Sequence, residues 1–282
     1  MINKPFLSII ISNYNYGRYI ESAILSVLHQ ECDDYELIIV DGGSTDNSVD
    51  VIRKYEEKIA WWVSEKDNGQ SDAFNKGFSH AKGMYITWLN ADDVMLPWAV
   101  ECVKAKALQT NADWLTGNFI RFEMNTRKII EAKWGPHLLP KCMQGNGWPI
   151  AVYGPSTFWK KSVYDAVGKL REDFHYSMDT EYWTRMYVRG YKQVRVNATC
   201  WAFGMHCESK TAEYGEHHCD DKVKARQDYE YMRRNEDNEY NQSSVKVFLT
   251  RAWRLLDGSF AVAVWRRLFV VGTSVDDMLE AQ

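Results

Sequence analysis

The sequence predicts an α/β fold in which helices flank a mostly parallel central sheet. Three features predict this class: apolar runs of strand length recur through the first 90 residues, segments with helical spacing separate them, and polar or acidic residues follow them. Strands that alternate with helices build a parallel sheet through right-handed crossovers. A chain of 282 residues is also long enough to bury a substantial core.

Each element of the first half follows from a local pattern. Residues 6–12 are continuously apolar, which is typical of a parallel strand covered on both faces. Further strands are expected at 35–41, 59–64 and 84–89, with helices at 19–30, 48–57 and 70–81, and Pro97 opens another helix.

The second half is less regular. Strands are expected at 112–123 and 127–133, followed by a short strand at 156–160. Residues 134–153 are rich in Gly, Pro and Trp, and long loops inside a domain are often functional. This segment is either a lid or acceptor-facing loop, or a plain surface loop.

Composition excludes several classes of protein. The net charge is −4, and acidic and basic residues are interspersed, so the sequence shows no basic patch that would bind nucleic acid. Six cysteines without a CxxC pair are typical of reduced thiols, and no apolar run approaches the roughly 18 residues of a membrane span. With no targeting segment before the first strand, we expect a cytoplasmic protein. The 12 Trp and 16 Tyr suit either sugar stacking or core packing.

Polar side chains gather where the predicted strands end. Because ligands bind at the carboxyl ends of the strands in an open α/β sheet, these positions predict a nucleotide site. Neither the dinucleotide fingerprint G-x-G-x-x-G nor the phosphate loop G-x-x-x-x-G-K-[ST] is present. The pattern instead indicates a carboxylate that binds the nucleobase and a metal ion that binds the diphosphate.

Asp92 and Asp93 directly follow the apolar strand at 84–89. Two adjacent carboxylates there suit Mg²⁺ or Mn²⁺, which take oxygen ligands and complete their shell with phosphates and water. The alternative is that one of them simply caps the following helix.

Two residues are candidates for binding a nucleobase. Asp41 follows the second strand, and an ionised carboxylate can accept the imide N–H of uracil or thymine, or the donor edge of guanine. Tyr14 can stack on the base. The alternatives are a turn-forming aspartate before Gly-Gly and a packed loop tyrosine.

Four segments in this order resemble family 2 glycosyltransferases of the GT-A fold: residues 7–15, 36–46, 68–77 and 88–93. The likeness covers roughly residues 5–212. It implies an inverting transferase that uses a nucleotide-activated sugar and a divalent metal.

Position by position, the resemblance assigns Ser12 and Tyr14 to the nucleoside, Asp41 to the base, and Gln70 and Asp72 to the diphosphate-sugar. Asn90 occupies the first acidic position of the family's metal motif. The metal is therefore expected on Asp92 and Asp93, most directly on Asp93.

The resemblance also implies a catalytic base. Inversion at an anomeric carbon needs a group that takes the acceptor hydroxyl's proton on the side opposite the leaving group. The family places it at the first carboxylate of the segment holding Asp179 and Glu181, so Asp179 is the expected base. The alternative is an aspartate favoured by the helix macrodipole.

A histidine followed by Ser-Lys-Thr resembles the family's closing segment. It implies His206 as a further metal ligand and Lys210 as a phosphate contact. A rival zinc site would use His206, Cys207, His217, His218 and Cys219, but adjacent residues cannot easily aim at one ion.

The chain is expected to divide into a catalytic domain at 1–212, with a nucleotide-binding half at about 1–110 and an acceptor-binding half at about 111–212, and a C-terminal helical extension at 213–282. Residues 245–271 mix aromatic and basic side chains. Such helices either lie on an anionic membrane or pack on the domain.

The expected function is transfer of a sugar, a hexose or an acetamidohexose, from a UDP-sugar to a glycan or lipid-linked glycan, as in polysaccharide biosynthesis. Two alternatives remain. A sugar nucleotidyltransferase would want a basic phosphate loop near the N-terminus, where residues 12–17 lack one. A non-catalytic glycan-binding module would neither hydrolyse nor transfer a nucleotide-sugar.

Overall fold

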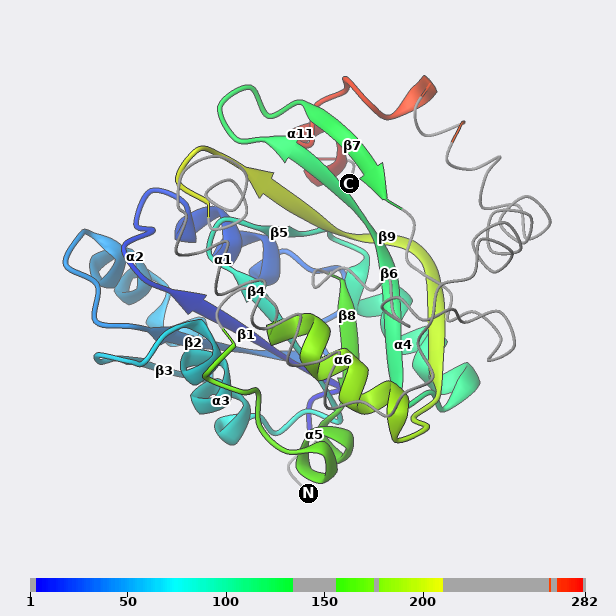
Figure 1. Cartoon of the computed structure of the whole chain (residues 1–282). Helices are drawn as coiled ribbons and strands as arrows, with labels where there is room; N and C mark the ends of the chain where they lie inside the picture. Colours follow the sequence, from blue (N-terminus) through cyan, green and yellow to red (C-terminus); the bar gives the residue numbers. More distant parts are fainter. Residues whose placement is uncertain (1–3, 134–155, 175–177, 210–263, 265–267, 281–282) are drawn as a thin grey trace.

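A computed structural model describes residues 4–133, 156–174, 178–209, 264 and 268–280. Within them, nine strands form one sheet in the order β3-β2-β1-β4-β8-β6-β9-β5, with β7 paired to β6. The sheet curls across the whole molecule (Figure 1).

The first half follows the predicted alternation. Its elements are β1 (Leu7–Asn13), α1 (Ile20–Leu28), β2 (Tyr35–Asp41), α2 (Ser48–Lys54), a 3₁₀ turn (Glu56–Lys58), β3 (Trp61–Ser64), α3 (Gln70–His80), β4 (Tyr85–Asn90), β5 (Val94–Met95) and α4 (Ala99–Thr110). Strands β3, β2, β1 and β4 are parallel. Their carboxyl ends therefore meet at one edge, as the sequence predicts.

The second half changes direction at β8. It contains β6 (Trp114–Glu123), β7 (Ile129–Lys133), β8 (Thr157–Lys160), α5 (Lys161–Val167), α6 (Met178–Val188), β9 (Gln193–Met205) and α11 (Asp276–Leu279). Strand β8 is antiparallel to both β4 and β6, and the long β9 runs parallel to β6. No strand was expected at β5 or β9 and no helix at α5. Residues 134–153 lie outside the described residues.

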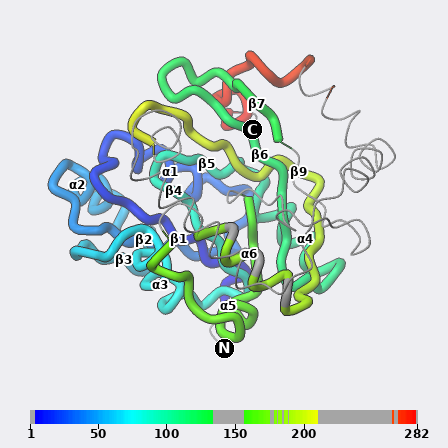
Figure 2. The backbone as a smooth tube through the Cα atoms, viewed as in Figure 1, coloured from blue at the N-terminus to red at the C-terminus, as the bar shows by residue number. Residues whose placement is uncertain are grey.

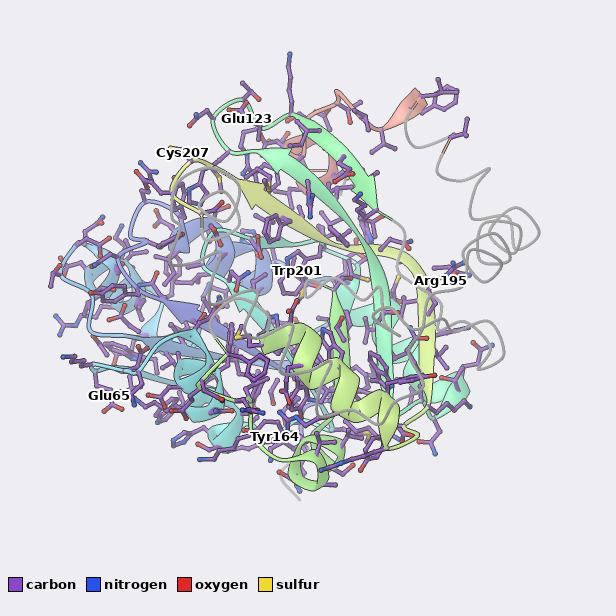
Figure 3. The ribbon with its side chains drawn as sticks, in the orientation of Figure 1. Glu65, Glu123, Tyr164, Arg195, Trp201 and Cys207 are labelled. Atoms are coloured by element: carbon purple, nitrogen blue, oxygen red, sulfur yellow. The ribbon has the colours of Figure 1, made fainter. Side chains whose placement is uncertain are left out.

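The helices cover both faces of the sheet. Helices α3, α5 and α6 lie on one face, while α1, α2 and α4 lie on the other (Figures 1 and 2). On the first face Trp88, Trp159 and Trp183 pack with ring centroids 4.9–5.1 Å apart and are at most 4% exposed. Trp201 is likewise buried, in the middle of the molecule (Figure 3). All four tryptophans are core residues, and the packing of Trp88 and Trp159 on Trp183 holds α6 against the sheet.

The last described residues pack on the sheet. Val275 is fully buried in a second apolar cluster with Val94, Ile120 and Phe122. Gly272 N donates to Ile129 O and Ile129 N donates to Thr273 O, so this segment runs beside β7. The end of the expected extension thus packs on the sheet, while residues 210–263 lie outside the described part. Among the described residues, no helix combines the length and apolarity needed to cross a membrane.

Candidate active site

Asp92 and Asp93 follow β4 as neighbours but have opposite surroundings. Asp93 is 1% exposed, and its carboxylate accepts hydrogen bonds from Gly204 N at 3.0 Å and from Asn90 Nδ2 at 2.9 Å. Burial, reinforced by the charge of Asp92, raises the pKa of Asp93 well above its ordinary value. Asp93 therefore braces the loop after β4 against β9.

Asp92 instead faces a cavity of about 500 Å³ between the start of α1, strand β5 and the turn from β6 to β7. The cavity is lined by Arg18, Tyr19, Ser22, Asp92, Val94, Met124, Asn125 and Arg127. Of the two aspartates, Asp92 therefore lines this cavity, whereas Asp93, the more direct metal ligand expected from the sequence, is buried against β9.

His206, at the end of β9, meets Asp92. Its Nε2 lies 3.0 Å from Asp92 Oδ2, and the two side chains are 4% and 12% exposed. The rings of Tyr16 and Tyr19 pack against the imidazole, with centroids at 5.6 and 4.6 Å. The imidazole is thus held between the two tyrosine rings and the carboxylate of Asp92.

This pair fits a divalent cation. Octahedral Mg²⁺ holds its ligands at about 2.1 Å, so neighbouring ligand atoms lie about 3 Å apart, and one or two protein ligands are commonly completed by phosphate and water. No group of three or more His, Cys, Asp or Glu side chains suited to a metal occurs among the described residues. A cation at Asp92 and His206 would therefore need ligands from a substrate and from water.

The start of α3 reaches the same edge. Gln70 Nε2 donates to Asn90 Oδ1 at 2.9 Å, which links α3 to the end of β4. Asp72 accepts a hydrogen bond from Asn68 N at 3.0 Å and lies 3.6 Å from Lys76 Nζ. Both predicted donor-lining residues thus lie at the carboxyl edge, and Asp72 also orders the loop before its helix.

Asp41 is fully buried at the end of β2. Its carboxylate accepts five hydrogen bonds, from Asn13 Nδ2, Gly43 N, Ser44 N, Ser44 Oγ and Ser64 Oγ, at 2.5–3.2 Å. Asp41 therefore joins the last residues of β1 and β3 to the loop after β2.

Ser12 and Tyr14 lie on the neighbouring loop and its strand. Ser12 is half-buried in β1, while the side chain of Tyr14 is exposed, at 60%. The packed-tyrosine alternative does not hold for Tyr14, because most of its surface is open to solvent.

The two acidic residues of the predicted segment, Asp179 and Glu181, both lie in the first turn of α6. Glu181 is 6% exposed and forms an ion pair with Arg185, with Nε 2.6 Å from Oε1. Asp179 lies in the same first turn and is half-buried. Since residues two apart point to different faces of a helix, Asp179 does not share the face on which Glu181 contacts Arg185.

Several predicted residues lie outside the described part. Lys210 is one, and so are His217, His218 and Cys219 of the rival zinc site. Within the described part His206 contacts Asp92, and Cys207 is exposed at the edge of the molecule (Figure 3).

Sequence reasoning missed the supporting residues. Asn13 was findable, because β1 and β2 pair in register and place it beside Asp41. Tyr16 and Tyr19 were not, because their partner His206 is remote in sequence and no local pattern connects them.

Solved structures place this fold in the GT-A class of transferases. TarS from S. aureus in complex with UDP-GlcNAc superposes with a TM-score of 0.60 at 15% identity, covering 93% of this chain and 77% of that one. The mannosyltransferase PcManGT from Pyrobaculum calidifontis, in complex with GDP-Man and Mn²⁺, superposes with a TM-score of 0.53 at 18% identity, covering 75% and 60%.

The chain belongs to glycosyl transferase family 2, whose family model matches residues 8–168. An uncharacterized glycosyltransferase of Nostoc sp. is 49% identical over 94 residues, which are 32% of this chain and 29% of that protein. The hyaluronan synthase of Pasteurella multocida is 42% identical over 107 residues, 36% of this chain and 11% of that protein. The chain thus spans less than a third of either relative.

Proposed function

We propose that this family 2 glycosyltransferase moves a sugar from a UDP-sugar to a hydroxyl of a glycan or lipid-linked glycan, with inversion at the anomeric carbon. The observation that carries the proposal is the Asp92–His206 pair at the carboxyl edge of a parallel sheet. Structural neighbours that bind UDP-GlcNAc, or GDP-Man with Mn²⁺, support it. The likeness to a hyaluronan synthase supports a role in polysaccharide synthesis.

The nucleoside would lie over the loops after β1 and β2. Tyr14 offers an exposed ring for stacking, and Ser12 lies at the same edge. Asp41 would accept the imide N–H of uracil in place of the hydroxyl of Ser44 or Ser64, because a hydroxyl can rotate to another acceptor.

The diphosphate would lie beside Asp92, with Gln70 and Asp72 toward the sugar and Lys210 as a further phosphate contact. Asp92 and His206 would hold Mn²⁺ or Mg²⁺. The bound cation would offset the charge that develops on the leaving nucleoside diphosphate. Asp93 supports this site from inside the fold.

Asp179 would act as the base. Its carboxylate takes the proton of the acceptor hydroxyl as that oxygen bonds to C1 of the sugar. The bond from C1 to the diphosphate oxygen breaks on the opposite side, which inverts the configuration. Glu181 is unsuited to this step because Arg185 already pairs with it.

A thermal-shift screen with UDP, GDP and their sugars, each with and without Mn²⁺, tests the donor. We expect UDP compounds to stabilise the chain most, and Mn²⁺ to increase the shift. Product analysis should then find free UDP and a β-linked product from an α-linked donor. Release of pyrophosphate, or stabilisation without any effect of Mn²⁺, would contradict the proposal.

Contact with the inner face of a membrane through residues 245–271 would bring a lipid-linked acceptor to this site. Val264, Leu268, Phe269 and Val271 are 37–69% exposed. Sedimentation with anionic vesicles should bring down the full chain and much less of a Leu268→Asp, Phe269→Asp variant. Equal sedimentation of the two would remove this part of the proposal.

A further inference from the structure

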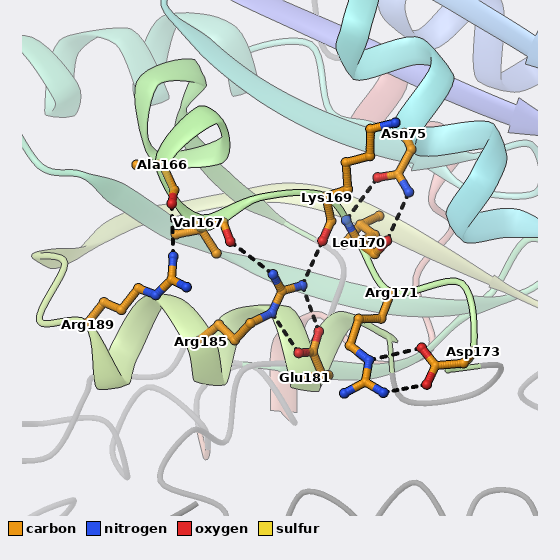
Figure 4. Close-up of polar contacts among 10 residues, drawn as sticks. All are labelled: Asn75, Ala166, Val167, Lys169, Leu170, Arg171, Asp173, Glu181, Arg185 and Arg189. Atoms are coloured by element: carbon orange, nitrogen blue, oxygen red, sulfur yellow. Dashed lines mark hydrogen bonds and ion pairs between the residues drawn. The ribbon is translucent and has the colours of Figure 1, made fainter. Parts of the chain in front are cut away.

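The connection between α5 and α6 is held from two sides by side chains of neighbouring helices (Figure 4). Asn75 of α3 holds Leu170, because its Oδ1 accepts from Leu170 N and its Nδ2 donates to Leu170 O, both at 2.9 Å. Arg185 of α6 donates to the carbonyls of Val167 at 3.1 Å and Lys169 at 2.8 Å. Residues 167–170 thus join α3 to α6.

Arg185 is itself fixed by Glu181. The guanidinium meets both carboxylate oxygens, with Nε–Oε1 at 2.6 Å and Nη2–Oε2 at 2.9 Å, and lies 4.9 Å from the centre of the Tyr182 ring. The planar guanidinium of Arg185 contacts both oxygens of the buried Glu181 carboxylate, and this two-point contact fixes the orientation of both side chains. The single ammonium group of a lysine cannot make the same contact. The pair therefore fixes α6 in rotation as well as in position.

The first turn of α6 has a second anchor on α3. Ser71 Oγ donates to Met178 Sδ at 3.1 Å. Asp179 follows Met178 and precedes Glu181, so both anchors flank the predicted base. They connect it to the helix whose first turn carries Gln70 and Asp72.

We propose that Arg185 and Glu181 are positioning residues that aim the Asp179 carboxylate at the donor site held by α3. The inference rests on the proposed role of Asp179 as the base. Misplacement of a reacting group by about 1 Å can cost a rate factor of about 100, whereas binding of a donor that contacts neither residue should change little.

The test measures UDP release from UDP-N-acetylglucosamine with Mn²⁺. For Arg185→Lys and Glu181→Gln we expect kcat to fall about 10- to 100-fold, with the KM for the donor unchanged within about twofold. Arg189→Lys is the matched control, because Arg189 directly follows α6 and its guanidinium donates a hydrogen bond to Ala166 O at 2.9 Å. Its kcat should stay at the parent value.

A double-variant comparison separates positioning from stability. If Arg185 acts through Asp179, adding Arg185→Lys to Asp179→Asn should not lower the remaining rate further. An unchanged kcat in Arg185→Lys, an equal loss in kcat and donor affinity, or a further loss on the Asp179→Asn background would overturn the inference.

Hydrogen exchange of the full chain supplies a readout that does not depend on the reaction. Amides of residues 178–184 should exchange at least about 10-fold faster in Arg185→Lys than in the parent or in Arg189→Lys. Equal exchange would overturn the inference. Absence of UDP release by the parent from every UDP-sugar that stabilises it, or full activity of Asp179→Asn, would instead contradict the proposed function. The exchange experiment would still test whether Arg185 holds the first turns of α6 in place.

Discussion

His206 and Asp92 are 114 residues apart in the sequence, and their side chains are 3.0 Å apart in the structure. The contact joins the end of β9 to the loop after β4, so it connects the two halves of the sheet. It also leaves Asp93, the immediate neighbour of Asp92, to a different task inside the fold.

Replacing His206 by alanine should weaken the response to metal. If His206 shares a cation with Asp92, its loss should raise the Mn²⁺ concentration needed for half-maximal stabilisation by UDP about 10-fold or more. A Mn²⁺ titration followed by thermal shift at saturating UDP measures this. Cys207→Ser, at the exposed next position, is the control. A midpoint identical in both variants would show that His206 is no ligand.

Asp93 should make stability depend on pH. Its pKa is raised in the folded chain, so between the ordinary value of 3.8 and the raised value the folded state binds more protons than the unfolded state. Stability therefore falls as pH rises through that window. Urea unfolding in EDTA should show that Asp93→Asn falls less steeply with pH than the parent. Parallel curves would contradict the assignment.

Asp179→Asn should lower kcat by a factor of about 100 to 10,000, the usual contribution of a general base. UDP affinity should stay within about twofold, because the base faces the acceptor. Steady-state kinetics and calorimetry separate the two effects. Asp173→Asn is the control, because that carboxylate pairs with Arg171 on an exposed loop. A kcat of Asp179→Asn equal to that of Asp173→Asn would show that Asp179 is not the general base.

Val275 should matter for the stability of the sheet. Val275→Ala removes two buried methyl groups from the second apolar cluster, which should lower the free energy of unfolding by about 1.5–3 kcal/mol. Chemical denaturation measures this, with Asp277→Ala at an exposed neighbouring position as the control. A change no larger than that of the control would show that the C-terminal segment does not stabilise the domain.

The first half of the fold could be predicted because its signals are local. Continuous apolar runs identify β1, β2 and β4, and each is followed by the polar residues that form the carboxyl edge. The short strand β8 was also predictable, but its antiparallel position between β4 and β6 was not. That position depends on long-range pairing, which no local pattern encodes.

The residue types of the candidate site could be predicted from the sequence, but the different surroundings of neighbouring acidic residues could not. The sequence marks both Asp92 and Asp93 as metal ligands and ranks Asp93 first, whereas the hydrogen bonds of Gly204 and Asn90 to Asp93 appear only in the structure. Likewise, the spacing of Asp179 and Glu181 shows that they face apart. The spacing does not show that Glu181 forms an ion pair with Arg185.

Whether Asp92 binds the cation that holds UDP can be measured by calorimetric titration of UDP, with and without Mn²⁺, into the parent, Asp92→Asn and Asp93→Asn. We expect Mn²⁺ to tighten UDP binding to the parent by at least about 10-fold, Asp92→Asn to abolish this gain, and Asp93→Asn to keep most of it. UDP binding that ignores Mn²⁺ in the parent, or a gain that Asp92→Asn retains, would contradict this expectation.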